Sequence, residues 1–358
     1  MSQKELNPLR KKVDQIDQEI LQLLNKRSEI VLKIGDLKKR DHEEVYAPLR
    51  EKSLLDTLAK KNKGPFPTHA LRAVFGEILS ASRSLQSPIR AAYLGPEATF
   101  THLAALRYLG RSTELIPETS ISKVFDAVEH NHAACGVVPI ENSTEGVVGA
   151  TLDRFLDSSL KITSETTLPI SHHLLSRSGN LRTLRRIYSH PQAIAQCRNW
   201  LDQNLPHIPV IETDSTAKAA EKAAADSQAA GIAGEHAAEI YGLKILKRHI
   251  EDNPNNMTRF LVIGKKSPSR TGQDKTSVLF SVKDQVGVLY QMLEPFYQKK
   301  INLTKIESRP LKKKAWEYIF FIDMDGHFED KKIREAIHAL EKKCLFLKVL
   351  GSYPKATT

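Results

Sequence analysis

Residues 9–38 read LRKKVDQIDQEILQLLNKRSEIVLKIGDLK, and this stretch decides the fold of the N-terminal region. Its apolar residues recur at helical spacing, and only Pro8 and Gly35 interrupt a helix-compatible composition between Glu5 and Lys39. One helix is therefore predicted over these residues, with a length of roughly 50 Å at about 1.5 Å per residue. Because this length exceeds what one small domain can cover, we expect a second chain to cover part of the helix.

Cations lie on the apolar face of this predicted helix. At about 100° per residue, one face carries the apolar side chains of Val13, Ile16, Ile20, Leu24, Val31 and Ile34. Arg27 and Lys38 fall near the middle of that face, and Arg10 falls at its edge. Burial of an unpaired cation is costly, so the three cations need anionic partners. The pattern alone fits either internal salt bridges with snorkelling stems or an anionic ligand.

Outward from this helix, the chain divides into three regions. Two further helices are predicted after Pro48 and Pro67, and a QSPI linker follows at 86–89. Up to Ile263, short apolar strands then alternate with helical stretches, which predicts two α/β lobes with largely parallel sheets. A polar linker precedes a strand-helix-strand-strand-helix-strand order, the ferredoxin-like arrangement. The predicted domains are all-α over 1–88, two-lobed α/β over 89–266 and α+β over 275–355.

Composition and charge narrow the classes of function. The chain has 358 residues and a net charge of +11, with the basic excess toward its two ends. Such charge attracts nucleic acid or small dianions, but no aromatic-basic recognition surface is evident, so no nucleic-acid partner is expected. The three cysteines, Cys135, Cys197 and Cys344, are too widely spaced for a disulfide scaffold or zinc ribbon. Without a signal-peptide pattern or a long apolar run, we expect a cytoplasmic protein with no membrane partner.

Three polar loops of the central region each follow a predicted strand and open a helix. They are GPEATFT at 95–101, ENSTEG at 141–146 and DST at 214–216. Ligands of open α/β sheets bind at the carboxyl ends of strands, so these loops predict a small polar ligand. For the first loop, a simple helix N-cap by Thr99 or Thr101 is the alternative.

Two further features of this region are ambiguous from pattern alone. Arg259 enters a predicted strand within NNMTRF at 255–260, where it could be an ordinary edge residue. His172 and His173 suggest a metal site, but neighbours on a strand point to opposite faces. We therefore expect a structural or supporting role for these histidines, and no metal.

Residues 1–86 resemble the all-helical chorismate mutase family, through 9–38, VYAPLRE at 45–51 and the Ser82 to Gln86 end. The resemblance implies rearrangement of chorismate to prephenate, which needs a held dianion and a stabilised ether oxygen but no nucleophile. It also implies that Arg10 reaches the site of a partner chain. The implied site has Arg10, Arg27 and Arg50 for carboxylates, Lys38 and Gln86 for the ether oxygen, Glu51 and the main chain near Ala47 for the hydroxyl, and Ser82 as a further contact.

Residues 91–264 resemble prephenate dehydratase, through YLGPEATFTHLAA at 93–105, GVVPIENSTEGVVGATLD at 136–153 and EDNPNNMTRFLVIG at 251–264. The resemblance implies a periplasmic-binding-protein-like fold and conversion of prephenate to phenylpyruvate with loss of carbon dioxide and water. Thr258 would be the essential hydroxyl and a candidate proton donor, with a water relay or a positioning role left open. Ala98 replaces a glycine common in the family. The remaining implied site residues are Arg259 for a carboxylate, Phe260 for pocket shape, and Thr99, Asn142, Ser143, Thr144, Ser215 and Thr216 along the cleft.

Residues 276–353 resemble the ACT domain, a regulatory ligand-binding module, through GVL at 287–289 and IESRP at 306–310. In dehydratases these regions bind phenylalanine at a dimer interface. Helix N-terminal amides suit a carboxylate, while the second segment taken alone could be only a strand-end turn. Valine in GVL replaces the family's alanine, which could retune effector binding. The implied effector-binding residues are Gly287, Val288, Leu289, Glu307, Ser308 and Arg309.

Together the three resemblances predict a bifunctional enzyme of phenylalanine biosynthesis that is inhibited by phenylalanine. Chorismate, prephenate and phenylalanine would be its ligands, it would use no cofactor, and it would form a homodimer or a higher homo-oligomer. The alternative is a non-catalytic cytoplasmic amino-acid sensor on a binding-protein scaffold. That alternative leaves Arg27 and Lys38 on an apolar helical face unexplained.

Overall fold

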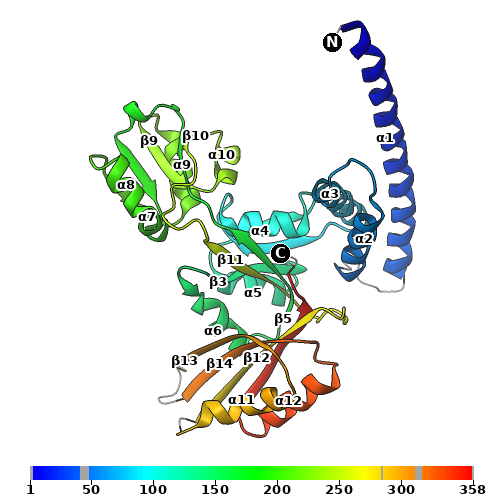
Figure 1. Ribbon diagram of the computed structural model, residues 1–358, viewed down its shortest axis with the longest axis vertical. Coiled ribbons are helices and arrows are strands. Elements are labelled where there is room, and N and C mark those ends of the chain that lie inside the picture. The colour runs from blue at the N-terminus through cyan, green and yellow to red at the C-terminus, as the bar shows by residue number, and fades with distance from the viewer. Residues whose placement is uncertain (1–2, 41–47, 284, 311–316, 357–358) are drawn as a thin grey trace. The chain divides into compact units, whose positions relative to one another are not determined.

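The computed structural model describes residues 3–40, 48–283, 285–310 and 317–356. The chain forms two compact units, one of residues 1–89 with 109–114 and one of residues 90–108 with 115–358. The first unit holds the helical domain, and the second holds the α/β and ferredoxin-like domains (Figure 1).

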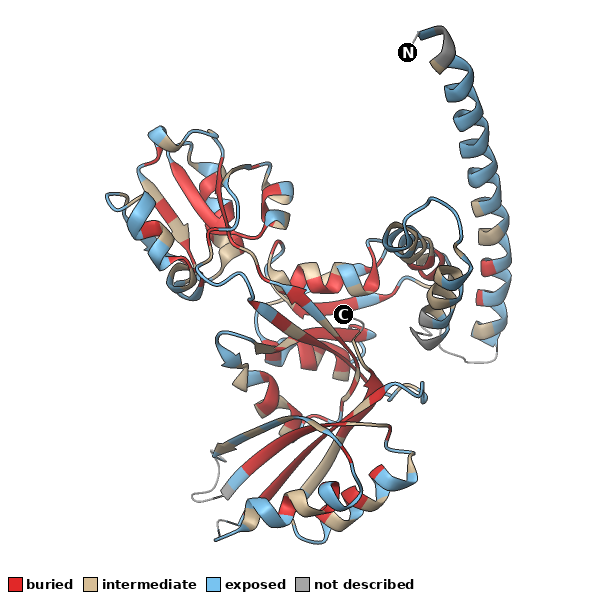
Figure 2. Cartoon of the chain, in the orientation of Figure 1, coloured by how far each residue is buried: buried red, intermediate tan, exposed pale blue. Residues whose placement is uncertain are grey.

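The described residues of the first unit form three helices, α1 (Gln3–Arg40), α2 (Pro48–Lys61) and α3 (Thr68–Gln86). Val31 and Gly35 of α1 are buried, whereas most of the helix is exposed (Figure 2). The exposed side chains include much of the predicted apolar face, with Val13, Ile16 and Ile20 each about half exposed. A single chain thus leaves a long apolar stripe of α1 in solvent, as the length of the helix predicted.

The α/β domain has two sheets, one in each lobe. The first sheet has the order β2-β1-β3-β11-β5, with β4 beside β3. The strands of this sheet and the helices of its lobe are, in chain order, β1 (Arg90–Leu94), α4 (Phe100–Leu109), β2 (Glu114–Glu118), α5 (Ile121–Glu129), β3 (Cys135–Asn142), β4 (Gly146–Val147), α6 (Gly149–Asp157), β5 (Lys161–Pro169) and β11 (Met257–Gly264).

The second sheet has the order β10-β6-β9-β7-β8. Its elements are β6 (His173–Ser176), η1 (Leu181–Thr183), β7 (Arg186–Ser189), α7 (Pro191–Gln196), α8 (Arg198–Asn204), β8 (Val210–Glu212), α9 (Thr216–Ala225), β9 (Ala229–Ala233), α10 (Glu235–Tyr241) and β10 (Lys244–Lys247).

The prediction of largely parallel sheets is wrong. β1 with β3 and β7 with β8 and β9 are parallel, but β11 is antiparallel to both β3 and β5, and β6 is antiparallel to both β9 and β10. The chain leaves the first lobe along β5 and returns along β11, so these two neighbouring strands must run in opposite directions.

The C-terminal domain has the predicted ferredoxin-like order. It comprises β12 (Asp274–Lys283), α11 (Val288–Gln298), β13 (Leu303–Pro310), β14 (Glu317–Asp325), α12 (Lys331–Glu341) and β15 (Phe346–Pro354). The sheet is antiparallel with the order β13-β14-β12-β15, and both helices cover one face (Figure 1).

The other face of this sheet packs on the α/β domain. Leu279, Phe321 and Tyr353 share a hydrophobic core with Phe125 and Phe155 of the first lobe. The two domains come close enough that a Cβ added at Gly351 would lie 2.3 Å from the carbonyl oxygen of Ile162. The sheet therefore docks directly behind β5 and β11.

Candidate active sites

Part of the predicted mutase site forms where α1 meets α3. Arg27 Nη1 donates a hydrogen bond to the hydroxyl of Ser82, and that hydroxyl donates to the carbonyl of Ile78 at 2.6 Å. The side-chain amide of Gln86 donates to the carbonyl of Ser82 at 3.4 Å. Arg27, Ser82 and Gln86 thus lie at one contact between two helices.

A glycine brings α1 close to Gln86. A Cβ at Gly35 would lie 2.8 Å from Cγ of Gln86, so only glycine lets the helix approach this closely. Lys38 lies three residues further on, on the same side of α1, and is half-buried. Oε1 of Gln86 is buried without a hydrogen-bond partner among the described residues, so this amide retains bonding capacity for a ligand.

The other two predicted arginines, Arg10 and Arg50, are both exposed. Arg10 precedes Arg27 by 17 positions in the same helix, a separation of roughly 25 Å. A small ligand held by Arg27 therefore cannot reach the Arg10 of the same chain.

Glu51 has a partner that sequence reasoning missed. Arg83, which is buried, forms an ion pair with Glu51 and donates to the carbonyl of Leu109. The arginine lies beside Ser82 in the segment that carried the family resemblance, but its position alone gave no signal of this pair. Ala47 lies outside the described residues.

The dehydratase prediction centres on Thr258, which lies opposite Asn142 in the pairing of β11 with β3. The amide nitrogen Nδ2 of Asn142 donates to Oγ1 of Thr258 at 2.8 Å. The amide oxygen of Asn142 accepts from the backbone N–H groups of Thr144 at 2.9 Å and Glu145 at 3.0 Å. These two bonds fix which end of the amide faces Thr258, so the hydroxyl is the acceptor and its own hydrogen remains available.

The chain of hydrogen bonds that starts at Asn142 continues into the second lobe. Asn142 also donates to Oδ1 of Asn256 at 2.7 Å, and Asn256 donates to Oε1 of Gln196 at 3.0 Å. Gln196 in turn donates to Glu145 at 3.1 Å. Nε2 of His172 lies 2.9 Å from the same oxygen of Gln196 and must be a donor, because that oxygen only accepts.

His172 therefore has the supporting role expected for it. Burial lowers its pKa, so its ring is neutral at pH 7. Sequence reasoning missed Asn256 and Gln196, although both lie in segments typical of the family. Polar residues at strand and helix ends were the available signal.

The other predicted cleft residues mainly form hydrogen bonds with backbone groups. Ser143 accepts from the N–H of Met257 at 2.9 Å and donates to the carbonyl of Asn255 at 3.2 Å, which ties its loop to β11. Thr99 accepts from the N–H of His102, and Ser215 caps α9, which begins at Thr216. Thr144, the chain neighbour of Ser143, is exposed. Roles in substrate binding remain predictions for these residues.

Arg259 and Phe260 lie on opposite faces of β11. Phe260 is buried. The guanidinium of Arg259 pairs with Glu165 and with Asp323, each at 2.7 Å, and donates to the hydroxyl of Tyr353 at 3.1 Å. Glu141 is a third carboxylate partner, 3.6 Å from Nη1 of Arg259. The role of Arg259 toward a substrate carboxylate remains a prediction.

The predicted effector residues fall into two groups. Gly287 precedes α11 in the left-handed conformation, with φ of 77°, followed by Val288 and by Leu289, which is exposed. Glu307 and Arg309 alternate with the exposed Ser308 along β13. Effector binding by either group remains a prediction.

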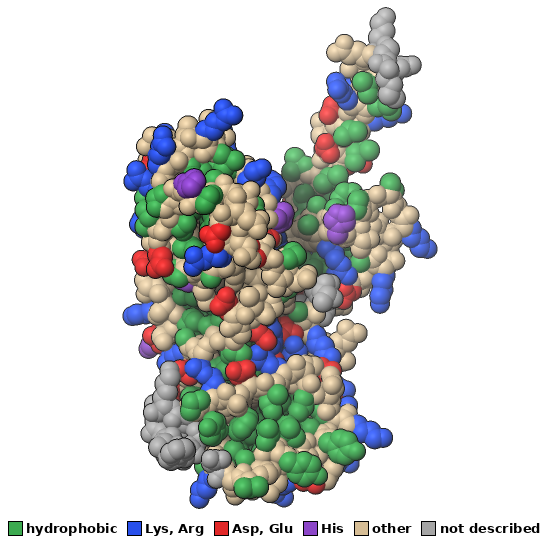
Figure 3. All heavy atoms as spheres, turned by 60° about the vertical axis from the view of Figure 1, so that its left-hand side comes forward, with side chains coloured by type: hydrophobic (Ala, Val, Ile, Leu, Met, Phe, Trp, Pro, Cys, Tyr) green, Lys and Arg blue, Asp and Glu red, His purple; other side chains and the backbone are tan. Residues whose placement is uncertain are grey.

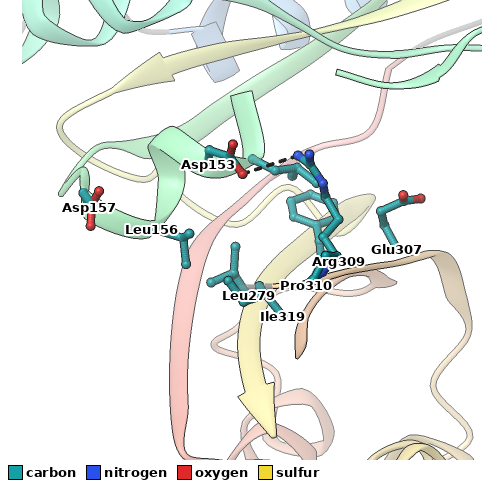
Figure 4. Close-up of a pocket in the computed structure, with 10 residues that line it drawn as sticks. Asp153, Leu156, Asp157, Leu279, Glu307, Arg309, Pro310 and Ile319 are labelled. Atoms are coloured by element: carbon teal, nitrogen blue, oxygen red, sulfur yellow. Dashed lines mark hydrogen bonds and ion pairs between the residues drawn. The ribbon is translucent and has the colours of Figure 1, made fainter. Parts of the chain in front are cut away.

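Glu307 and Arg309 line a cavity of about 120 Å³ between α6 and the C-terminal sheet (Figure 4). Arg309 reaches Asp153 of α6 at 3.4 Å. The rest of the cavity wall is formed by Leu152, Leu156, Asp157, Leu279, Pro310, Ile319 and Phe321.

Comparison with known proteins finds three domains in the predicted order. Family models match for chorismate mutase type II over residues 9–87, prephenate dehydratase over 91–268 and the ACT domain over 276–342. The bifunctional chorismate mutase/prephenate dehydratase of Aquifex aeolicus is 51% identical over 356 residues, which cover 98% of each chain. The chain belongs to this family.

A second relative and a solved structure show similarity to the same family. The bifunctional chorismate mutase/prephenate dehydratase of Stutzerimonas stutzeri is 41% identical over 98% of each chain. The solved structure of prephenate dehydratase from Arthrobacter aurescens in complex with L-Phe has a TM-score of 0.69 and 36% identity, covering 74% of this chain and 90% of that one. The predicted fold class and family are therefore confirmed.

Two other features are absent from the described part of the chain. Within the described ranges, no helix is long and apolar enough to cross a membrane. The same residues contain no cluster of three or more histidine, cysteine, aspartate or glutamate side chains suited to a metal ion.

Proposed function

We propose that the helical domain rearranges chorismate to prephenate, that the α/β domain converts prephenate to phenylpyruvate, and that phenylalanine inhibits the second step through the ACT domain. Membership of the bifunctional family and the three matched domains support both activities. The observation that carries the dehydratase chemistry is the fixed hydrogen bond from Asn142 to Thr258. No observation supports the non-catalytic sensor.

The dehydratase step needs a proton at one place. The carbon–carbon bond to the ring carboxylate breaks, its electron pair completes the aromatic ring, and the carbon–oxygen bond breaks toward the leaving hydroxyl. Hydroxide is a poor leaving group, so a donor must protonate or hydrogen-bond it as charge develops. Because Thr258 accepts from Asn142, its own hydrogen is directed to another partner, which suits that donor role.

The mutase step needs only a substrate held in its reactive conformation and a stabilised charge on the breaking ether oxygen. Arg27 would hold a carboxylate, and Lys38 with Gln86 would stabilise charge on the breaking ether oxygen. Arg10 would act in the site of a second copy of the chain, because the length of α1 separates it from Arg27 of its own chain. The exposed apolar stripe of α1 gives that second copy a surface to cover.

A homodimer with shared mutase sites predicts complementation. Arg10→Ala and Arg27→Ala chains should each lose mutase activity, whereas their co-expressed mixture should regain it, because one site of each mixed dimer carries neither change. Purification through two different tags isolates the mixed dimer, and chorismate consumption measures its activity. An inactive mixed dimer would show that both arginines serve the same chain's site.

The ACT domain would sense phenylalanine. The Arthrobacter aurescens dehydratase was solved with L-Phe, which supports this ligand. Hydrophobic side chains gather on the surface of the C-terminal domain (Figure 3). The exposed large hydrophobic side chains of this domain include Leu289, Tyr290 and Ile306. This surface fits contact with a second ACT domain and an aromatic effector. We also place the enzyme in the cytoplasm, in keeping with its three free cysteines.

The test of the proposed function uses the full-length chain. Given chorismate, it should form prephenate first and phenylpyruvate after it. Millimolar phenylalanine should suppress only the formation of phenylpyruvate, or suppress it more strongly than the formation of prephenate. Products are followed by chromatography over time. Prephenate without phenylpyruvate would remove the dehydratase assignment, and equal rates with and without phenylalanine would remove the feedback.

A further inference from the structure

Two residues that face the ACT domain are chain neighbours of the catalytic pair. Asn142 lies opposite Thr258 in the β3–β11 pairing, and Glu141 lies opposite Arg259 one step along. Since side chains alternate along a strand, Glu141 and Arg259 share the face opposite to that pair. That face is the one on which the ACT sheet docks.

The ACT sheet holds both of these neighbours by ion pairs. Asp323 of β14 meets Nη1 of Arg259 at 2.7 Å, and Lys305 of β13 meets Glu141 at 2.8 Å. A third pair, with its cation on the ACT sheet as in the Lys305 pair, joins Lys275 of β12 to Glu165 of β5 at 2.8 Å. Arg259 also binds Glu165 at 2.7 Å and lies 3.6 Å from Glu141, so the three pairs form one network across the domain boundary.

The centre of the network is deeply buried. The side chain of Asp323 is 0% exposed and that of Glu165 is 3% exposed. Ser277 donates to Asp323 and lies 2.7 Å from the hydroxyl of Tyr353, which accepts from Arg259. Burial alone would raise the pKa of Glu165, but Arg259 and Lys275 outweigh it and hold that pKa below its ordinary value.

A buried network of this kind resists partial opening. Removing one partner leaves an uncompensated charge without water, which is strongly unfavourable. A shift of the ACT sheet must therefore either carry Arg259 and Glu141 with it or break the contact. Both movements act on β3 and β11 at the positions next to Asn142 and Thr258.

We propose that Asp323 and Lys305 of the ACT domain are positioning residues of the dehydratase site, and that the effector acts on Thr258 through them. Asp323 holds the strand of Thr258 through Arg259, and Lys305 holds the strand of Asn142 through Glu141. The regulatory half of this inference rests on the proposed inhibition by phenylalanine, whereas the positioning half requires only dehydratase activity.

The location of Lys305 gives the effector a direct route to this contact. Lys305, Glu307 and Arg309 lie on one face of β13, so two of the predicted effector residues, Glu307 and Arg309, share a strand and a face with the anchor of Glu141. A ligand that moves β13 thus moves Lys305 with it. Such coupling requires different effector affinity for the two positions of the sheet.

The first test replaces Asp323 by asparagine, which keeps the shape and removes the charge. Dehydratase kcat should fall at least about tenfold with KM for prephenate nearly unchanged, because Asp323 acts through strand position and not through substrate contact. Mutase activity should be unchanged. If Arg259 instead binds the substrate, the freed guanidinium should lower KM or leave kcat intact, and either result would overturn the proposal.

Asp325→Asn is the matched control. Asp325 is two residues along β14 and pairs with Lys355, a contact within the ACT segment that does not reach β3 or β11. This variant should keep the wild-type dehydratase kcat. An equal loss in both variants would show that the effect comes from the stability of the ACT domain rather than from Arg259.

The second test, Lys305→Met, keeps the apolar stem and decides the regulatory half even if Asp323→Asn does not fold. It should raise the phenylalanine concentration for half-inhibition at least about tenfold, the size of a typical allosteric coupling. Unaltered inhibition in this variant would overturn the regulatory half. A wild-type chain that ignores phenylalanine would refute the proposed feedback and with it this regulatory half, while the kcat of Asp323→Asn would still decide the positioning half.

Discussion

Thr258→Ala should abolish prephenate dehydration and leave chorismate mutation intact. Loss of a proton donor at the leaving hydroxyl is expected to lower dehydratase kcat by about 10²- to 10⁴-fold, the usual contribution of general acid catalysis. The methyl group and backbone of Thr258 lie in a strand paired on both sides, so the fold should survive. Separate assays with chorismate and with prephenate on one preparation measure the two activities.

Two companion variants separate the donor role from a packing role. Thr258→Ser keeps the hydroxyl and should keep most of the activity. Asn142→Asp keeps the size but replaces the donating amide by an acceptor, so the hydroxyl of Thr258 would turn its hydrogen toward the carboxylate. Dehydratase activity should then fall although the hydroxyl is present. Full activity in Asn142→Asp would show that the direction of this hydrogen bond is irrelevant to catalysis.

Much of the fold could be predicted because its signals are local. The apolar period of residues 9–38 predicts α1 without reference to any other segment. The C-terminal order of strands and helices likewise follows from short runs of residues. Strand direction depends instead on which distant strand becomes a neighbour. The prediction of parallel sheets was wrong because β11 returns beside β5 in the opposite direction.

The sites show the same division between local and long-range information. Motifs placed Thr258 and Asn142 together, and the structure joins them directly. Alternation along a strand, which separated His172 from His173, also predicts that Arg259 points away from Thr258. Its partner Asp323 lies 64 residues later in another domain, and no local pattern identifies such a pair. For this reason, the buried ion-pair network across the two domains could not be predicted from the sequence.

Lys38→Ala should have the reverse effect to Thr258→Ala. Lys38 is half-buried on the side of α1 that carries Gly35, and we expect it to supply the positive charge at the breaking ether bond. Removal of one such donor from a preorganised site lowers kcat by about 10²- to 10³-fold. The chorismate reaction should therefore slow by this factor, while dehydration of supplied prephenate should continue at the wild-type rate.

Lys39→Ala provides the matched control, because Lys39 is the next residue of α1, carries the same charge and is exposed. It should retain full mutase activity. The comparison cancels any general effect of lowering the basic charge of α1, so a loss confined to Lys38→Ala assigns that loss to one position on the helix. Equal losses in both variants would mean that overall attraction of the dianion, and not a placed cation, accounts for the contribution of α1. Loss of both activities in a folded Lys38→Ala chain would mean that the two sites do not act independently.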